Sequence, residues 1–264
     1  LMLYGADVNN EDKEININNF TKLVDESSWV EFMPKGVTKK MFEDFKKYYD
    51  PDIFRAAGKK IRAMARAADD LTIEERIERI TNIFSSFRNP DKETVLTPWR
   101  VVNMHLGDCM GGYSFLDGAR ENTITEPHYV SQGKVTDNVF STSSKVLEIN
   151  SKSGLYPLYV AYSIYRNLVN SGNNKNKSIN LTIEQQQKFW DKVVAENIFV
   201  ISKTPMAKSI TNRTLVGFRK AQVNSQYVED IVEQITKTPD KFIKTITNAK
   251  TFWKIKNGKI MNFD

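Results

Sequence analysis

The stretch that decides the fold is Val146 to Arg166, VLEINSKSGLYPLYVAYSIYR. Residues 146–150 are typical of a buried strand, and the residues from Pro157 onward repeat apolar and aromatic side chains at helical spacing. The Ser-Lys-Ser-Gly segment 151–154 between them predicts a short turn. Doubly wound sheets hold nucleotide-like ligands in this way, because the ligand lies at the carboxyl end of a strand beside a helix N-terminus. The plainer alternative is a polar loop between two core elements.

Three residues of this stretch are candidates for ligand contact. Gly154 lacks a Cβ, so we expect the ligand to pass close to it. Glu148 in the strand and Asn150 at its end carry a carboxylate and an amide, which could meet amino or hydroxyl groups. A serine nucleophile is excluded, because the Gly-x-Ser-x-Gly elbow of hydrolases is missing.

Strand and helix patterns alternate after residue 146, which predicts a parallel α/β unit. The stretch NIFVIS, residues 197–202, is a second candidate strand, and Thr204-Pro205 is a helix start. The remaining expectations are helices over 157–168, 182–195, 227–236 and 239–248, an exposed link over 170–180, and a turn at Asn257-Gly258 that leads into a final strand. That last strand suggests a piece of a longer polypeptide.

The first ninety residues have helical periodicity instead. Apolar residues repeat over 39–49 and again after Pro51, and we expect Met41, Phe45 and Ile53 to face inward. A third helix begins after Thr72, where Glu75 completes the sequence of a capping box. We therefore divide the chain into three parts. These are a partly irregular N-terminal extension (1–34), a helical subdomain (35–95) and a partial α/β domain (96–264).

The pair Thr97-Pro98 predicts another helix start. We expect Thr97 to be the N-cap and Pro98 the first helical residue, where its missing N–H costs nothing. From Gly112 to Ser144 the sequence is rich in turn residues and only weakly periodic. We expect an irregular loop there, with one short helix. His105 and His128 have no second ligand at useful spacing, so no metal site is predicted.

The composition argues against a secreted or membrane-spanning protein and is consistent with one that binds DNA. The chain of 264 residues has a formal charge of +6 and a single cysteine, which cannot pair within the chain and so favours a reducing compartment. No apolar run approaches the roughly 20 residues that span a bilayer, and residues 1–19 do not have the charged-then-apolar pattern of a signal sequence, so we expect a cytoplasmic protein. Ten basic residues between Lys35 and Arg66 fit either a solvated helical surface or a face that contacts DNA phosphates.

Two stretches read in order resemble a known family. LTPWRVVNMHL (96–106) and VLEINSKSGLYPLYVAYSIYR (146–166) look like the first two signatures of the amino class of N6-adenine DNA methyltransferases. The likeness is greatest to the methylase region of bacterial restriction-modification proteins that fuse a helicase to a methylase. It extends over about residues 35 to 264, and it implies an N-terminal helical bundle packed on a partial Rossmann-like sheet.

The resemblance also implies site residues and partners. It implies S-adenosylmethionine as the cofactor, double-stranded DNA as the substrate, and helicase and further methylase domains in the same polypeptide. The closing Asn262 to Asp264 resembles the strand that leads into an Asn-Pro-Pro-Tyr motif, so the catalytic motif is expected beyond Asp264. The implied cofactor contacts are Thr97, Pro98, Glu148, Asn150, Ser153 and Gly154.

Some positions depart from the family pattern. Ile149 and Lys152 replace a proline and a glycine of the cofactor turn. The second strand ends Ser202-Lys203, where the family has an acid that binds the ribose. The first hypothesis is therefore the cofactor-binding part of an adenine-N6 DNA methyltransferase. The missing acid favours a second one, a non-catalytic DNA-binding or domain-coupling module with a methyltransferase-like shape, and the intact Thr-Pro start and Ser-Gly turn oppose it.

Overall fold

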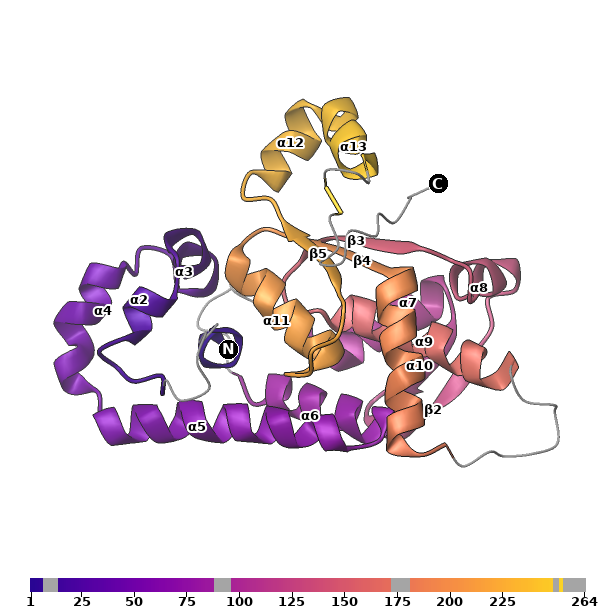
Figure 1. Cartoon of the computed structure of the whole chain (residues 1–264), viewed down its shortest axis with the longest axis horizontal. Helices are drawn as coiled ribbons and strands as arrows, with labels where there is room; N and C mark the ends of the chain where they lie inside the picture. The colour runs from indigo at the N-terminus through magenta and orange to yellow at the C-terminus, as the bar shows by residue number, and fades with distance from the viewer. Residues whose placement is uncertain (7–13, 88–95, 172–180, 249–251, 254–264) are drawn as a thin grey trace.

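The chain folds into a group of helices followed by a mixed α/β unit (Figure 1). The computed structural model describes residues 1–6, 14–87, 96–171, 181–248 and 252–253. Of the expected link over 170–180, residues 170–171 are helical and the rest lie outside these residues, as do the turn at Asn257-Gly258 and the final strand. The predicted combination of an N-terminal helical part with an α/β part is confirmed.

Local capping chemistry fixes the starts of the N-terminal helices. Side chains of Asp25, Thr38 and Asp50 accept hydrogen bonds from the first-turn N–H groups of α3, α4 and α5. The capping box of Thr72 with Glu75 is present at the start of α6, as predicted. The helices are α1 (Met2–Gly5), α2 (Phe20–Leu23), α3 (Glu26–Phe32), α4 (Lys39–Phe45), η1 (Lys46–Tyr48), α5 (Pro51–Ala67), η2 (Ala68–Asp70) and α6 (Ile73–Ser85).

The predicted inward face of α4 and α5 is wrong at several positions. Phe42 is buried against Phe20 and Trp29, but Phe45 is 55% exposed and Ile53 is 68% exposed. Met41 is also exposed. The described residues therefore bury only part of the apolar side chains that repeat along α4 and α5.

The region around α7 (Trp99–Cys109) differs from the sequence prediction in two respects. Pro98, not Thr97, is the N-cap, and no side chain caps the helix. The expected loop over 112–144 contains an antiparallel hairpin, β1 (Gly112–Leu116) and β2 (Thr123–Val130), followed by α8 (Lys134–Val139). The hairpin escaped prediction because β2 is rich in polar residues and none of its residues is buried, so it lacks the apolar alternation of a strand.

The second sheet has three parallel strands in the order β3-β4-β5. The strands β3 (Val146–Ser151) and β4 (Ile198–Ser202) confirm two predictions, whereas β5 (Asn224–Tyr227) was not predicted and overlaps the expected helix over 227–236 only at Tyr227. The connections are α9 (Leu155–Ser171) with α10 (Ile183–Asn197), and α11 (Pro205–Val216). Thr204 caps α11 and Pro205 is its first residue, as expected.

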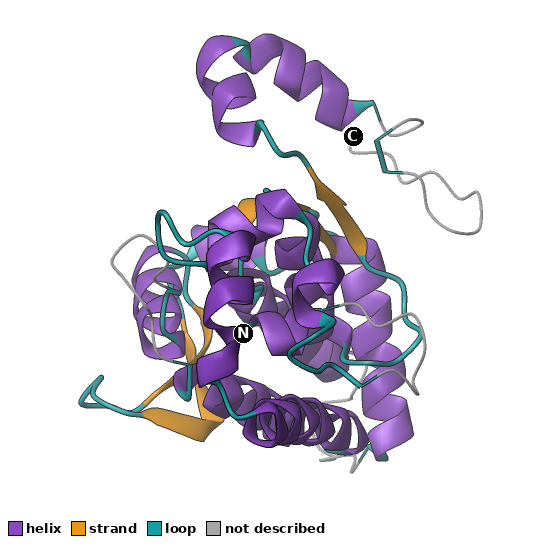
Figure 2. Ribbon diagram, turned by 90° about the vertical axis from the view of Figure 1, so that its left-hand side faces the viewer, coloured by secondary structure: helices purple, strands orange, loops and turns teal. Residues whose placement is uncertain are grey.

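Helices cover both faces of this sheet (Figures 1 and 2). On one face, Ile198 and Val200 of β4 belong to the large core that includes residues of α9, α10 and α11. On the other face, Phe199 and Ile201 belong to a small core with residues of α12 (Ile231–Lys237) and α13 (Pro239–Thr247). Side chains alternate between the two faces along β4, and helices cover both faces. All five residues of β4 are therefore buried.

Among the described helices, none combines the length and the apolar character that a membrane crossing needs.

Candidate functional site

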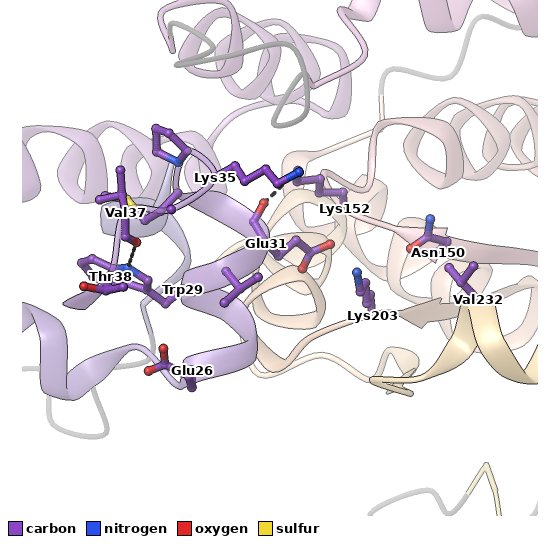
Figure 3. A pocket seen from close by; sticks show the side chains of 14 residues that line it. Glu26, Trp29, Glu31, Lys35, Val37, Thr38, Asn150, Lys152, Lys203 and Val232 are labelled. Carbon is purple, nitrogen blue, oxygen red and sulfur yellow. Dashed lines mark hydrogen bonds between the residues drawn. The ribbon is translucent and has the colours of Figure 1, made fainter. Parts of the chain in front are cut away.

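A pocket of about 650 Å³ lies where strands β3 and β4 end. Asn150 and Lys152 come from the end of β3, Lys203 follows β4, and Val232 belongs to α12. The opposite wall comes from the N-terminal helical part, so the pocket joins segments far apart in the sequence (Figure 3). That wall consists of Glu26, Trp29, Val30, Glu31, Met33, Pro34, Lys35, Gly36, Val37 and Thr38. Ligands of parallel α/β sheets bind outside the carboxyl ends of the strands, so this is the candidate site.

The end of β3 is irregular at Asn150. Its φ of 68° places it in the left-handed region, and the pairing with β4 shifts register between Ile149 and Ser151. Asn tolerates this backbone conformation better than most residues. Asn150 is exposed and lines the pocket, so the irregularity presents its amide to the site.

The close approach of α11 explains why position 154 is a glycine, with no ligand needed. Its φ is 77°, and an added Cβ would lie 3.0 Å from the Cα of Thr211 and 3.1 Å from the Cβ of Thr214. Thr214 also donates a hydrogen bond of 2.7 Å to the carbonyl oxygen of Ser153. In the described part of the chain, Ser153 and Gly154 therefore contact α11 and are not among the residues that line the pocket. Their cofactor contact stays a prediction.

Glu148 is the acidic residue of the predicted site, and burial perturbs its carboxylate. It is partly buried by surface area, but its Oε2 atom is fully buried and has no hydrogen-bond partner among the described residues. Burial raises the pKa of Glu148 to about 7, and a hydrogen bond from Ser151 offsets part of that effect. Near neutral pH this side chain can therefore accept a hydrogen bond as an anion or donate one as an acid.

A second unpartnered atom lies on the neighbouring strand. Ser202 is fully buried, and its Oγ has no hydrogen-bond partner within the described ranges. Ser202 pairs with Ser151 at the strand ends, whereas Glu148 pairs with Val200, so the two unpartnered groups lie on adjacent strands. Buried polar groups are normally satisfied, so two such groups favour a polar ligand or ordered water near the strand ends.

Lysine side chains make the pocket positive. Lys35, Lys152 and Lys203 line it, together with the carboxylates of Glu26 and Glu31. Lys152 is held in place, because its Nζ lies 3.3 Å from the carbonyl oxygen of Glu31 and 5.0 Å from the centre of the Phe32 ring. The pocket therefore suits a ligand that carries an anionic group as well as polar ones.

Thr97 and Pro98, which were predicted to contact the cofactor, lie away from the described residues that line the pocket. Thr97 is partly buried and Pro98 is exposed, and neither residue is among the described residues that line the pocket. The helix that they precede does reach the start of α9, since His105 Nδ1 lies 3.2 Å from the hydroxyl of Tyr156. His105 thus has a local partner, and no cluster of three metal-ligating side chains occurs among the residues that the structure describes.

Sequence reasoning missed the N-terminal wall of the pocket. It assigned residues 1–34 to a partly irregular extension, yet α1, α2 and α3 lie there and Trp29 is buried. Asp25 followed by a helical stretch was a capping signal for α3. No local pattern, however, could place Glu31 beside a strand end more than a hundred residues away.

The comparisons with known proteins bear on the end of the chain. The family model of the Eco57I restriction-modification methylase matches residues 196–264. This match supports a methyltransferase of the restriction-modification type. It covers β4, α11, β5, α12 and α13, and so includes one of the two strands that form the pocket. The comparison with curated proteins found no match, and the comparison with solved structures found none.

Proposed function

We propose that this chain is the cofactor-binding part of an S-adenosylmethionine-dependent adenine-N6 DNA methyltransferase in a bacterial restriction-modification system. The match of residues 196–264 to the methylase family is the observation that carries the proposal. The pocket at the ends of β3 and β4 supports it, because parallel α/β sheets bind nucleotide-like ligands at that edge. The layers of helices on both faces of the sheet are compatible with a Rossmann-like arrangement.

The residues at the strand ends fit the proposed cofactor. Its adenosyl and methionine parts carry hydroxyl, amino and carboxylate groups. The buried Oε2 of Glu148 and Oγ of Ser202 have no partner in the described residues, and both residues lie on the strands beside the pocket without lining it. Asn150 would bind a polar group of the cofactor, and the ammonium of Lys152 would bind its carboxylate. When bound, S-adenosylmethionine supplies an activated methyl group.

The rest of the proposal concerns partners and domain organisation. Double-stranded DNA would be the substrate, and the target adenine would have to leave the duplex to reach a bound cofactor. We propose the division into residues 1–34, 35–95 and 96–264, a cytoplasmic location, and further helicase and methylase domains in the same polypeptide. Thr97 and Pro98 would lie near the methionine end of the cofactor.

A second candidate function follows from the end of β4. Lys203 stands there, where a ribose-binding acid is expected in a nucleotide-binding sheet. A protein that had lost cofactor binding could keep this fold as a non-catalytic DNA-binding or domain-coupling module. The two functions differ in whether the chain binds S-adenosylmethionine.

Calorimetric titration of S-adenosylmethionine into the chain separates them. The enzyme function predicts saturable binding in the micromolar range. It also predicts that Asn150→Gly lowers the affinity for S-adenosylmethionine at least tenfold. This variant removes the side-chain amide, and glycine adopts the positive φ of this position without strain. Ile149→Thr is a matched control at the exposed neighbouring position. Absence of binding to the wild-type chain would exclude the cofactor-binding function and leave the coupling module.

A further inference from the structure

Glu31 lies at the strand edge although it belongs to the N-terminal helix α3. Its carboxylate oxygen Oε2 accepts a hydrogen bond from the hydroxyl of Thr204, the second residue after β4. Its main-chain carbonyl accepts the hydrogen bond from Lys152, which follows β3. Residues that follow the carboxyl ends of β3 and β4 therefore hold Glu31 at the pocket, although Glu31 and Thr204 are 173 residues apart along the chain.

The surroundings of Glu31 set it apart from the other acid in the pocket. The side chain of Glu26 is 70% exposed, whereas Glu31 is partly buried. Burial raises the pKa of Glu31, and the hydroxyl of Thr204 and the charges of Lys152 and Lys203 counteract that rise. These opposing effects show a carboxylate that is partly withdrawn from water and held beside two ammonium groups. The hydrogen bond to Thr204 uses Oε2, and the carboxylate has a second oxygen with which to accept.

The position of this carboxylate matches a general requirement of nucleotide sites. In doubly wound sheets, an acid after the second strand accepts hydrogen bonds from the ribose hydroxyls. Here β4 is followed by Lys203 and Thr204, neither of which can do this as an anion. The carboxylate of Glu31 is bonded to Thr204 and lines the same pocket as Lys203. Figure 3 shows Glu31 on the side of the pocket that faces Lys203 and Asn150.

We infer that Glu31 supplies, from the N-terminal helical part, the carboxylate that binds the ribose hydroxyls of an adenosyl ligand in this pocket. The inference rests on the proposed function, since it requires that the chain binds such a ligand. It makes α3 part of the binding site, so residues 1–34 take part in ligand binding. A purely structural role, in which Glu31 only fastens α3 to Thr204, is the competing explanation.

The test compares two ligands on three forms of the full chain. The ligands are S-adenosylhomocysteine and its analogue that lacks both ribose hydroxyls, each titrated calorimetrically. The proteins are the wild type, Glu31→Gln and Thr204→Val. Glu31→Gln keeps the shape of the side chain and removes its charge, and Thr204→Val removes the hydroxyl that Glu31 contacts. Thermal unfolding of each form verifies that it is folded.

We expect Glu31→Gln to weaken S-adenosylhomocysteine at least tenfold and to leave the already weak binding of the analogue unchanged. Thr204→Val should alter the two ligands by similar factors, because it removes the anchor of α3 and the N-cap of α11 but leaves the charge of Glu31 in place. Equal losses for both ligands in Glu31→Gln, or no loss for either, would overturn the inference and leave the proposed function standing. A wild-type chain that binds neither ligand would overturn both.

Discussion

Arg76 of α6 caps the end of α11, because its Nη1 donates a hydrogen bond of 3.0 Å to the carbonyl oxygen of Thr214, 138 residues away. Its Nη2 donates to the carbonyl of Arg213 at 3.0 Å, and its Nε lies 3.5 Å from Asp69. The last carbonyls of a helix have no partner within it, and a cation also favours that end of the helix dipole. Arg76 is buried, so it connects the N-terminal helices to the sheet through the core.

Replacing Arg76 by methionine should destabilise the fold by about 3 kcal/mol or more, because it removes the charged partner of the buried Asp69 and the side-chain donor to the carbonyl of Thr214. Urea unfolding measures the change in free energy. Arg79→Met is the control, since Arg79 is exposed on the same helix. If the two variants cost the same, the capping contact contributes nothing.

Gly154→Ala should destabilise the chain even without ligand. The residue has a positive φ, and the new Cβ would approach α11 at about the closest distance that real structures show. Gly133→Ala is the matched control, because Gly133 also has a positive φ and nothing lies within 4 Å of its added Cβ. We expect G154A to cost about 1 kcal/mol or more beyond G133A in urea unfolding. Equal costs would mean that Gly154 is not required by α11, and would restore ligand approach as the reason for the glycine.

The sequence predicted the helices that begin at a side-chain cap and the strands that are apolar runs, because these signals lie within a few residues of each other. The caps at Thr72 and Thr204 were predicted correctly, because a hydroxyl bonds the backbone two or three residues away. The strands β3 and β4 were found from their own apolar runs. The same logic failed at Thr97, whose side chain does not cap α7.

The candidate site was harder to predict, since most of it is formed by distant segments. Asn150 is the predicted residue that lines the described pocket, and it follows directly from its place at the end of β3. Glu31 and the rest of α3 reach the site only through the packing of the N-terminal part on the strand ends. The role of Gly154 beside Thr211 likewise depends on where α11 lies, which no spacing within the turn encodes.

The aromatic residues of α4 and η1 provide a test of which face is buried. Phe42→Ala should cost about 3 kcal/mol or more, because Phe42 packs against Phe20 and Trp29 and is 8% exposed. Tyr48→Ala should change the free energy of unfolding by less than about 0.5 kcal/mol, since Tyr48 is 73% exposed. Chemical unfolding of both variants measures the difference. A large cost for Tyr48→Ala would show that this face is covered in solution.

Glu148 should make the stability of the chain depend on pH in a defined direction. Its pKa is about 7 in the folded chain, against about 4.3 in an unfolded one. Between these values the folded state keeps a proton that the unfolded state has lost. The free energy of unfolding therefore falls as pH rises from about 4.3 to about 7, and this contribution levels off above that.

Glu148→Gln removes this dependence, because an amide does not titrate. Relative to wild type, the variant should gain stability as pH rises from 5 to 8, by an amount on the order of 2 kcal/mol. Urea unfolding at both pH values measures the gain, with the exposed Glu121→Gln as the control. The Oε2 atom of Glu148 is buried and unpartnered in the described chain, so desolvation of the anion is the cause of the effect. If Glu148→Gln and wild type keep the same difference at pH 5 and pH 8, then Glu148 is already ionised in the folded chain, and water or a residue outside the described ranges must be bound to it.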